Sequence, residues 1–243
     1  MSRRPAVTEE ILLLRRRPFR DRSDLVDGLS RTSGRVAGVI HRSRSFVPDP
    51  PILVQASRRS GPSLDTFSQP LVLNAYPGLR SSLEAMLVAG FLGRLFLGSL
   101  PEAEPNEGAF ELLSGIYQAL ARQADPRACG LWGQSRLLEL LGLAPQIEVC
   151  VLCGSSDLVA FSALEGGVLC GACFSDNGFR LPEGELGLLR RLRLDSWQEV
   201  LMGGLPPGEV RTAGRVFKSQ LQVHLGLSDD YFKRVLPKRE GQV

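Results

Sequence analysis

Histidine is scarce in this chain, and the sequence motifs of common catalytic sites are missing from it. The 243 residues include two histidines, and no GxxxxGK[ST], GxGxxG, GxSxG or HExxH pattern occurs. The acidic residues form no paired pattern that specifies general acid–base chemistry. We therefore expect a protein that is not an enzyme and that hydrolyses no ATP.

Long hydrophobic runs are also missing. No uncharged apolar stretch reaches the roughly 18 residues that a membrane span needs. The longest candidate, residues 85–93, is bounded by Glu84 and Arg94. The N-terminus begins Met1-Ser2-Arg3-Arg4 and has no apolar segment of the secretory type. The expected location is the cytoplasm.

The charge is distributed unevenly along the chain. Residues 1–80 hold 14 Arg, no Lys and 7 acidic residues, whereas residues 81–243 hold 15 basic and 19 acidic residues. A segment with this excess of arginine indicates an anionic partner, either nucleic acid or an anionic lipid surface. The alternative is a soluble basic surface without a partner.

The hydrophobic pattern changes from β-like to helical at about residue 77. Before it, five short strands with no helix between them favour a small closed barrel over a parallel sheet. After it, the apolar period is helical, except in residues 146–180, which show no period. Helices are expected at 79–100, from 106, at 126–143, from 182, at 208–225 and after 228. The predicted fold class is therefore α+β, with a barrel followed by a helical domain.

Four cysteines form the strongest chemical signal. Cys150, Cys153, Cys170 and Cys173 make two CxxC pairs with 16 residues between them. This spacing is typical of a zinc ion held by four thiolates, and a shell filled by protein ligands is structural. A redox dithiol pair is the alternative. The fifth cysteine, Cys129, is expected to be buried in a helix.

Arginines gather at the predicted strand ends and loops of the barrel. This arrangement suits a groove for single-stranded nucleic acid, in which arginines bind phosphates and aromatic rings stack on bases. Phe19 and Phe46 are the stacking candidates, although each could equally lie in the core. The candidate DNA-binding residues are Arg15, Arg16, Arg17, Arg20, Arg35, Arg42, Arg44, Arg58 and Arg59.

The order of these features resembles the RecO family of bacterial recombination mediators in the RecF pathway. The matching segments are 11–19 with 24–25, 34–36 with 42–44, 76–79, 105–113, 137–145 before Cys150, and 223–226. The resemblance implies an N-terminal OB-fold, a helical domain and a zinc finger. The expected limits are 1–76 for the OB-fold, 77–145 and 181–243 for the helical domain, and 146–180 for the finger.

The resemblance also implies a function. It implies binding of single- and double-stranded DNA, annealing of complementary strands at the nucleoid, and action with RecR to load RecA onto strands coated with single-strand-binding protein. That coating protein ends in an acidic tail with apolar terminal residues, which we expect to bind helices 106–143 near Arg122, Arg127 and Arg136. Two rivals are an enzyme held together by zinc and a zinc-ribbon factor that binds RNA or RNA polymerase.

Overall fold

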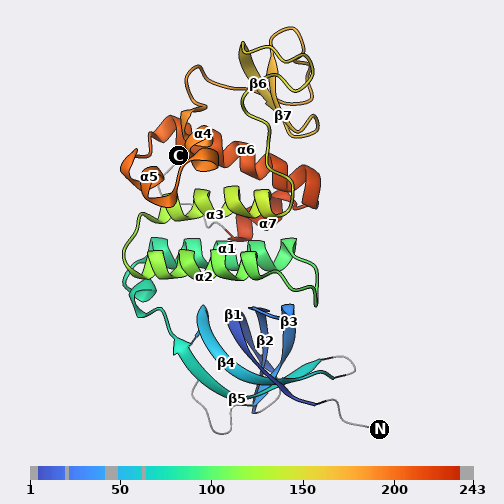
Figure 1. Cartoon of the computed structure of the whole chain (residues 1–243), viewed down its shortest axis with the longest axis vertical. Helices are drawn as coiled ribbons and strands as arrows, with labels where there is room; N and C mark the ends of the chain where they lie inside the picture. The colour runs from blue at the N-terminus through green and yellow to red at the C-terminus, as the bar shows by residue number, and fades with distance from the viewer. Residues whose placement is uncertain (1–4, 20–21, 42–48, 62–63, 236–243) are drawn as a thin grey trace. The chain divides into compact units, whose positions relative to one another are not determined.

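The chain contains two compact units. The computed structural model describes residues 5–19, 22–41, 49–61 and 64–235 (Figure 1). The first unit is Met1–Pro126 and the second is Arg127–Val243. The domain limits expected at residues 76, 145 and 180 stay predictions.

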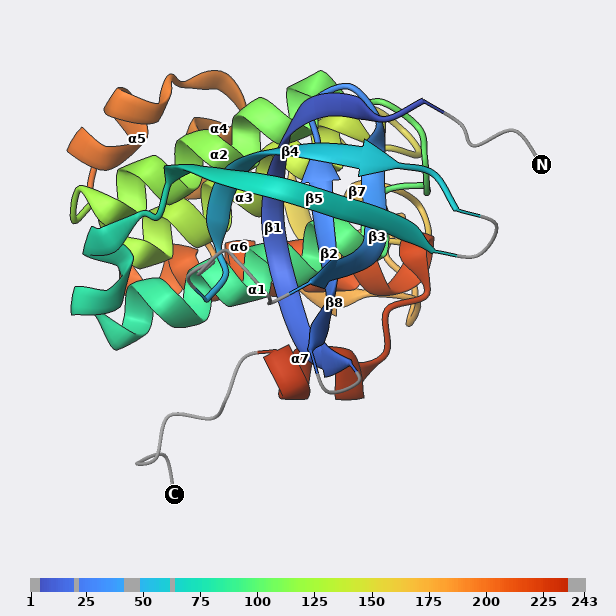
Figure 2. The same cartoon turned by 90° about the horizontal axis from the view of Figure 1, so that it is seen from below.

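Five strands of the first unit close into a barrel, as expected. They are β1 (Val7–Phe19), β2 (Ser23–Ser30), β3 (Gly34–His41), β4 (Ile52–Arg59) and β5 (Asp65–Asn74). Their order is β1-β2-β3-β5-β4, and β1 pairs with β4 to close the barrel (Figure 2). β3 and β5 run parallel, and the other neighbouring strands are antiparallel. This is an OB-fold, so the predicted fold class is confirmed.

Alternating side chains of the strands fill the barrel. Residues separated by two positions point to the same side of a strand, which places Ile11 and Leu13 of β1 in the interior with Val26 and Phe67. The sequence predicted only a short first strand at residues 11–14. The strand is longer, because β4 pairs with residues 7–13 and β2 pairs with residues 11–19.

Two helices of the first unit pack on the barrel. Ser82 and Asn106 cap α1 (Leu83–Ser99) and α2 (Glu107–Ala121) by accepting hydrogen bonds from backbone N–H groups. The start expected at residue 79 instead forms the 3-10 turn η1 (Pro77–Ser81). The helices approach closely at Gly93, where an added Cβ would lie 2.7 Å from the Tyr117 hydroxyl.

The second unit combines helices with a small sheet. Its helices are α3 (Pro126–Leu140), α4 (Gly187–Leu194), α5 (Trp197–Met202), α6 (Pro207–Leu225) and α7 (Asp229–Val235). Its sheet has the order β7-β6-β8, from β6 (Leu158–Ser162), β7 (Gly167–Cys170) and β8 (Phe179–Arg180). The sequence did not predict these strands, which are too short for a period, nor α5. None of the helices in the described part of the chain is long and apolar enough to cross a membrane.

Candidate nucleic-acid interface and metal centre

A β-bulge in β1 selects which arginines face outward. Leu13 pairs with Gly28 of β2, but the next pair joins Arg15 to Asp27, so Leu14 is an extra residue. Residues directly opposite each other in an antiparallel pair lie on the same face. Because Asp27 and Leu25 alternate with the core residue Val26, their partners Arg15 and Arg17 lie on the outside of the barrel.

The outer face of β1–β3 is both cationic and apolar. Register places Leu25 opposite Val39, and Asp27 opposite Ala37. Both Leu25 and Val39 are half-buried, whereas Ala37 and His41 are exposed. The members of this face are Arg15, Arg17, Phe19, Leu25, Asp27, Ala37, Val39 and His41. Exposed guanidinium groups can bind phosphates, and an apolar strand surface with a half-buried phenyl ring can contact bases.

Several of the candidate arginines are engaged by acidic residues. Arg16 lies 2.6 Å from Asp49 and 3.9 Å from Asp24, and Arg35 lies 2.7 Å from Glu102. By contrast, Arg15 and Arg59 are exposed and form no ion pair with any described residue. The remaining candidates Arg20, Arg42 and Arg44, with Phe46, lie outside the described residues.

Arg58 belongs to a polar network at the barrel rather than to its open surface. It donates to the buried carboxylate of Glu9, to Asp65 at 2.6 Å and to the Ser33 hydroxyl at 2.7 Å. Ser30 also donates to Glu9, whose side chain is 1% exposed. Burial opposes ionisation of Glu9, but hydrogen bonds from Ser30, Ser33 and Arg58 outweigh it and lower the pKa of this carboxyl.

Breaking this network should destabilise the barrel. Replacing Arg58 by alanine leaves the buried Glu9 charge without its partner, and we expect the free energy of unfolding to fall by about 3 kcal/mol at pH 7. Because folding lowers the pKa of Glu9, its ionised carboxylate adds to the free energy of unfolding at pH values above the usual pKa of 4.5. This stabilisation is lost as the pH falls through the pKa of Glu9 in the folded protein. Urea unfolding at pH 7 and pH 4 measures both effects.

The control for this prediction is Glu9→Gln, which removes the titrating group. This variant should lose less stability between pH 7 and pH 4 than the wild-type protein does. Equal losses in the two proteins would show that Glu9 does not carry the acid sensitivity.

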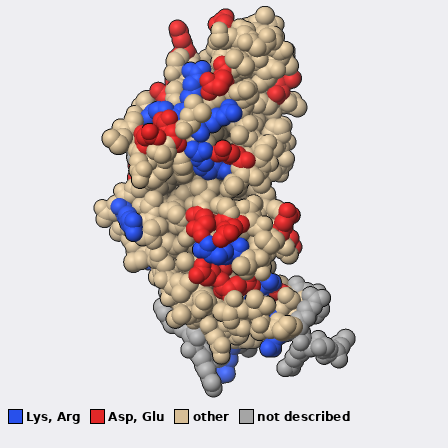
Figure 3. Space-filling view, viewed as in Figure 1, with Lys and Arg blue, Asp and Glu red and all other residues tan. Residues whose placement is uncertain are grey.

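Arg31 has a structural role that its sequence context does not predict. Its guanidinium lies 3.0 Å from Glu10 and 3.2 Å from Glu107, contacts Glu111, and stacks over the Phe110 ring at 4.6 Å. Basic and acidic side chains are correspondingly interspersed on the face shown in Figure 3. These contacts attach the β2–β3 turn to α2. Nothing in the local sequence signals them, because Glu107 and Glu111 are 76 and 80 residues away.

The four cysteines converge as their spacing predicts. The Sγ atoms of Cys150, Cys153, Cys170 and Cys173 all lie within 4.8 Å of one another, and those of Cys153 and Cys170 are 3.5 Å apart. Thiolates about 2.3 Å from a tetrahedral ion would be about 3.8 Å apart. The cluster thus has the dimensions of a four-sulfur metal site, and these residues could hold one metal ion.

The electrostatics of the cluster also suit a cation. Burial opposes ionisation of Cys150, but the backbone N–H groups of Cys170, Leu152 and Cys153 lower its pKa to about 6. The neighbouring sulfurs of Cys153 and Cys170 raise the pKa of Cys173 to about 12. Four thiolates in one place repel each other, and a divalent ion would offset that repulsion.

Local structure brings the two pairs together. The Gly154 N–H bonds the Cys150 carbonyl at 2.8 Å, in a turn where Gly154 adopts a φ of +77°. That positive φ is one that glycine adopts without strain. Cys170 ends β7, and the Cys173 N–H bonds its carbonyl at 3.2 Å. The fifth cysteine, Cys129, is buried in α3, outside the cluster, as expected.

The candidate partner-binding arginines lie at the end of α2 and in α3, and their role in binding a partner stays a prediction. Arg122 is exposed at the end of α2, and Arg127 is exposed in α3. Arg136 stacks over the Trp132 ring at 4.2 Å and lies 2.6 Å from Glu139. Large apolar residues of the same helices include Tyr117, Leu120, Trp132 and Leu137. Of these, Tyr117, Leu120 and Leu137 are buried, so they offer no open surface.

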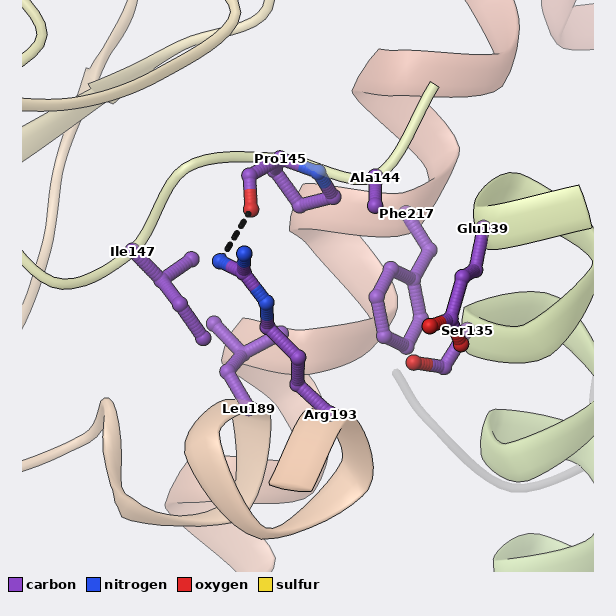
Figure 4. Close-up of a pocket in the computed structure, with 8 residues that line it drawn as sticks. All are labelled: Ser135, Glu139, Ala144, Pro145, Ile147, Leu189, Arg193 and Phe217. Atoms are coloured by element: carbon purple, nitrogen blue, oxygen red, sulfur yellow. Dashed lines mark hydrogen bonds between the residues drawn. The ribbon is translucent and has the colours of Figure 1, made fainter. Parts of the chain in front are cut away.

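A pocket that the sequence did not predict lies in the second unit, beside Arg136. Its volume is about 170 Å³, and its walls come from α3, α4, α6 and the segment after α3 (Figure 4). The lining residues are Ser135, Glu139, Ala144, Pro145, Ile147, Leu189, Arg193 and Phe217. Arg193 is exposed, and its Nη1 lies 3.5 Å from the Pro145 carbonyl oxygen. The pocket thus combines apolar walls with one cationic group, Arg193, and one carboxylate, Glu139, which is paired with Arg136.

Comparison with known proteins identifies the family. The sequence model described as "Recombination protein O C terminal" matches residues 80–230. The chain is 32% identical over 196 residues to the DNA repair protein RecO of Symbiobacterium thermophilum, which covers 74% of this chain and 77% of that protein. It is 26% identical over 228 residues to the DNA repair protein RecO of Moorella thermoacetica, covering 89% and 85%.

The chain belongs to the RecO family. This confirms the resemblance seen in the sequence and gives the chain a role in DNA repair. The relatives carry the name of a repair protein rather than that of an enzyme. The family match starts in η1 and ends in α7, so this RecO-family segment includes the four cysteines and the pocket.

Proposed function

We propose that this RecO-family chain is a recombination mediator, not an enzyme, that binds single- and double-stranded DNA and anneals complementary strands without ATP. The observation that carries the proposal is the outer face of β1–β3, where the bulge exposes Arg15 and Arg17 beside Leu25 and Val39. Guanidinium groups bind phosphate, and the apolar strand surface with Phe19 suits bases.

Such a face should bind DNA through its charged phosphates, with little dependence on base sequence. Phosphate contacts carry no sequence information, and their strength falls steeply with salt. Annealing then needs only that two phosphate backbones be neutralised while bases pair. We propose that Arg59 extends this surface and that Arg20, Arg42 and Arg44 also bind DNA, whereas Arg16, Arg35 and Arg58 serve mainly the internal ion pairs described above.

We further propose that the metal is zinc and that its role is structural. Four cysteine sulfurs leave no position for water or substrate, and zinc is the ion that most often takes this ligand set. The zinc ion would then stabilise the fold of the finger, residues 146–180. The proposed location of the protein is the cytoplasm, in association with the nucleoid.

An annealing assay tests the proposed function. Complementary oligonucleotides should pair faster with the protein than without it, at equal rates with and without ATP. Strands coated with single-strand-binding protein should also be annealed, and RecR should promote loading of RecA onto them. Absence of any acceleration would contradict the proposal, and stronger binding to RNA than to DNA of equal length would favour a zinc-ribbon RNA-binding factor.

We propose that the tail of single-strand-binding protein docks in the pocket of the second unit. The last apolar side chain of the tail suits the walls formed by Ile147, Leu189 and Phe217. The C-terminal carboxylate of the tail suits Arg193. Arg136 does not line the pocket. It acts on the pocket indirectly, because it forms an ion pair with Glu139, which lines the pocket. Arg127, an exposed residue of the same unit, would act as an additional basic group for the acidic part of the tail, and the role of Arg122 in the first unit stays a prediction.

Charge reversal tests this docking site. Arg193→Glu should weaken binding of the tail peptide to the full chain by about tenfold or more, since it replaces a charge-assisted hydrogen bond by repulsion. Arg136→Glu should also weaken binding of the tail peptide. Arg211→Glu, a charge reversal at an exposed residue of α6, should not. Fluorescence anisotropy measures the affinity. Unchanged binding in both Arg193→Glu and Arg136→Glu would place the tail elsewhere.

A further inference from the structure

Asp27 is an acidic side chain in the middle of the outer face of β1–β3. Register places it directly opposite Arg15 in β1 and Ala37 in β3. It is also the diagonal neighbour of Arg17, and its Oδ2 lies 3.6 Å from Arg17 Nη2. A carboxylate in this position opposes the approach of phosphate, so it is unexpected on a face that binds DNA.

No hydrogen bond from the described residues fixes this carboxylate, whose side chain is 24% exposed. Among the described residues, Arg17 is the only charged partner of Asp27. The separation of 3.6 Å is longer than a direct hydrogen bond, and the Arg17 side chain is 48% exposed. The pair is therefore held by charge alone, and it can open when another anion approaches Arg17.

We propose that Asp27 competes with DNA phosphate for Arg17 and thereby limits the affinity of the face for DNA. This inference rests on the proposed function and deepens it. A strand that binds must displace Asp27 from Arg17, and the same carboxylate recaptures Arg17 when the strand leaves. Release is a necessary step for an annealing protein, because the paired duplex must depart before the face can bind again.

The test is Asp27→Asn, which removes the charge and keeps the shape. A labelled single strand should bind this variant about three- to tenfold more tightly than the wild-type protein in low salt, through slower dissociation. One additional phosphate contact should also steepen the dependence of log affinity on log salt by about 0.7. In the Arg17→Gln background, where there is nothing to compete for, the gain should fall below about twofold.

The control is Glu104→Gln, which makes the same change in net charge at an exposed residue outside this face. No gain for Asp27→Asn, or an equal gain for Glu104→Gln or in the Arg17→Gln background, would overturn the inference. Failure of the wild-type protein to bind DNA would overturn the proposed function and the inference together. Normal wild-type binding with unchanged affinity for Asp27→Asn overturns the inference alone.

Discussion

Replacing Cys170 by serine should remove the bound metal and unfold the zinc finger. We expect the wild-type protein to contain one zinc ion per chain and the variant to contain well under a tenth of that. Structural zinc sites provide roughly 10–16 kcal/mol of apparent binding free energy, which in such modules is also folding free energy. Cys170 is buried against Cys150, Ala160 and Leu169, so its loss disrupts the small core of the finger as well as the site.

Metal analysis and amide hydrogen exchange together measure this effect. Cys129→Ala is the matched control, because Cys129 is a buried cysteine outside the cluster and its loss should leave zinc content unchanged. DNA binding should survive in Cys170→Ser, since the proposed interface lies in the barrel. Wild-type protein with well under one zinc ion per chain would contradict the assignment.

Reversing the charges of Arg15 and Arg17 together should reduce affinity for single-stranded DNA on the order of 100-fold in low salt. Two phosphate contacts become two repulsions, so the slope of log affinity against log salt should decrease by about 1.4. Sequence preference should not change, because these contacts position the strand without reading it. Affinity measured between about 50 mM and 200 mM salt shows both effects.

The control for net charge is the double variant Arg122→Glu and Arg211→Glu. Both residues are exposed, and neither lies on the outer face of β1–β3. This control should bind DNA with an affinity within a few-fold of the wild-type value. If the two double variants lose affinity equally, the effect is one of total charge and the interface is not where we place it.

The sequence was sufficient to predict the barrel, most of the helical segments and the clustering of the four cysteines. Short strands without intervening helices leave few architectures, and the CxxC spacing predicts a four-sulfur site whatever surrounds it. A helix was likewise expected from residue 106, and Asn106 caps it by accepting a hydrogen bond from the Ala109 N–H at 2.9 Å. Each of these signals is local, so it can be read without knowing the fold.

The selection among the arginines could not be predicted, because it depends on distant residues. The bulge at Leu14 places Arg15 and Arg17 outward, and its position depends on the pairing with β2, where an added Cβ at Gly28 would lie 2.8 Å from the Leu12 carbonyl oxygen. Arg58 forms an ion pair with Glu9, which is 49 residues away in the sequence. The amino-acid composition does not distinguish these arginines from one another. The tertiary structure does, because it shows which of them are paired with acidic residues.

Site-specific photocrosslinking tests the central claim most directly, which is that DNA lies on the outer face of β1–β3. A photoreactive amino acid would replace Ala37, which is exposed in the middle of this face, or Leu71, which is 59% exposed on β5. We predict that a single strand crosslinks at position 37 and not at position 71, and that Arg15→Glu with Arg17→Glu abolishes the crosslink. Crosslinking at position 71 alone, or equally at both positions, would contradict the account.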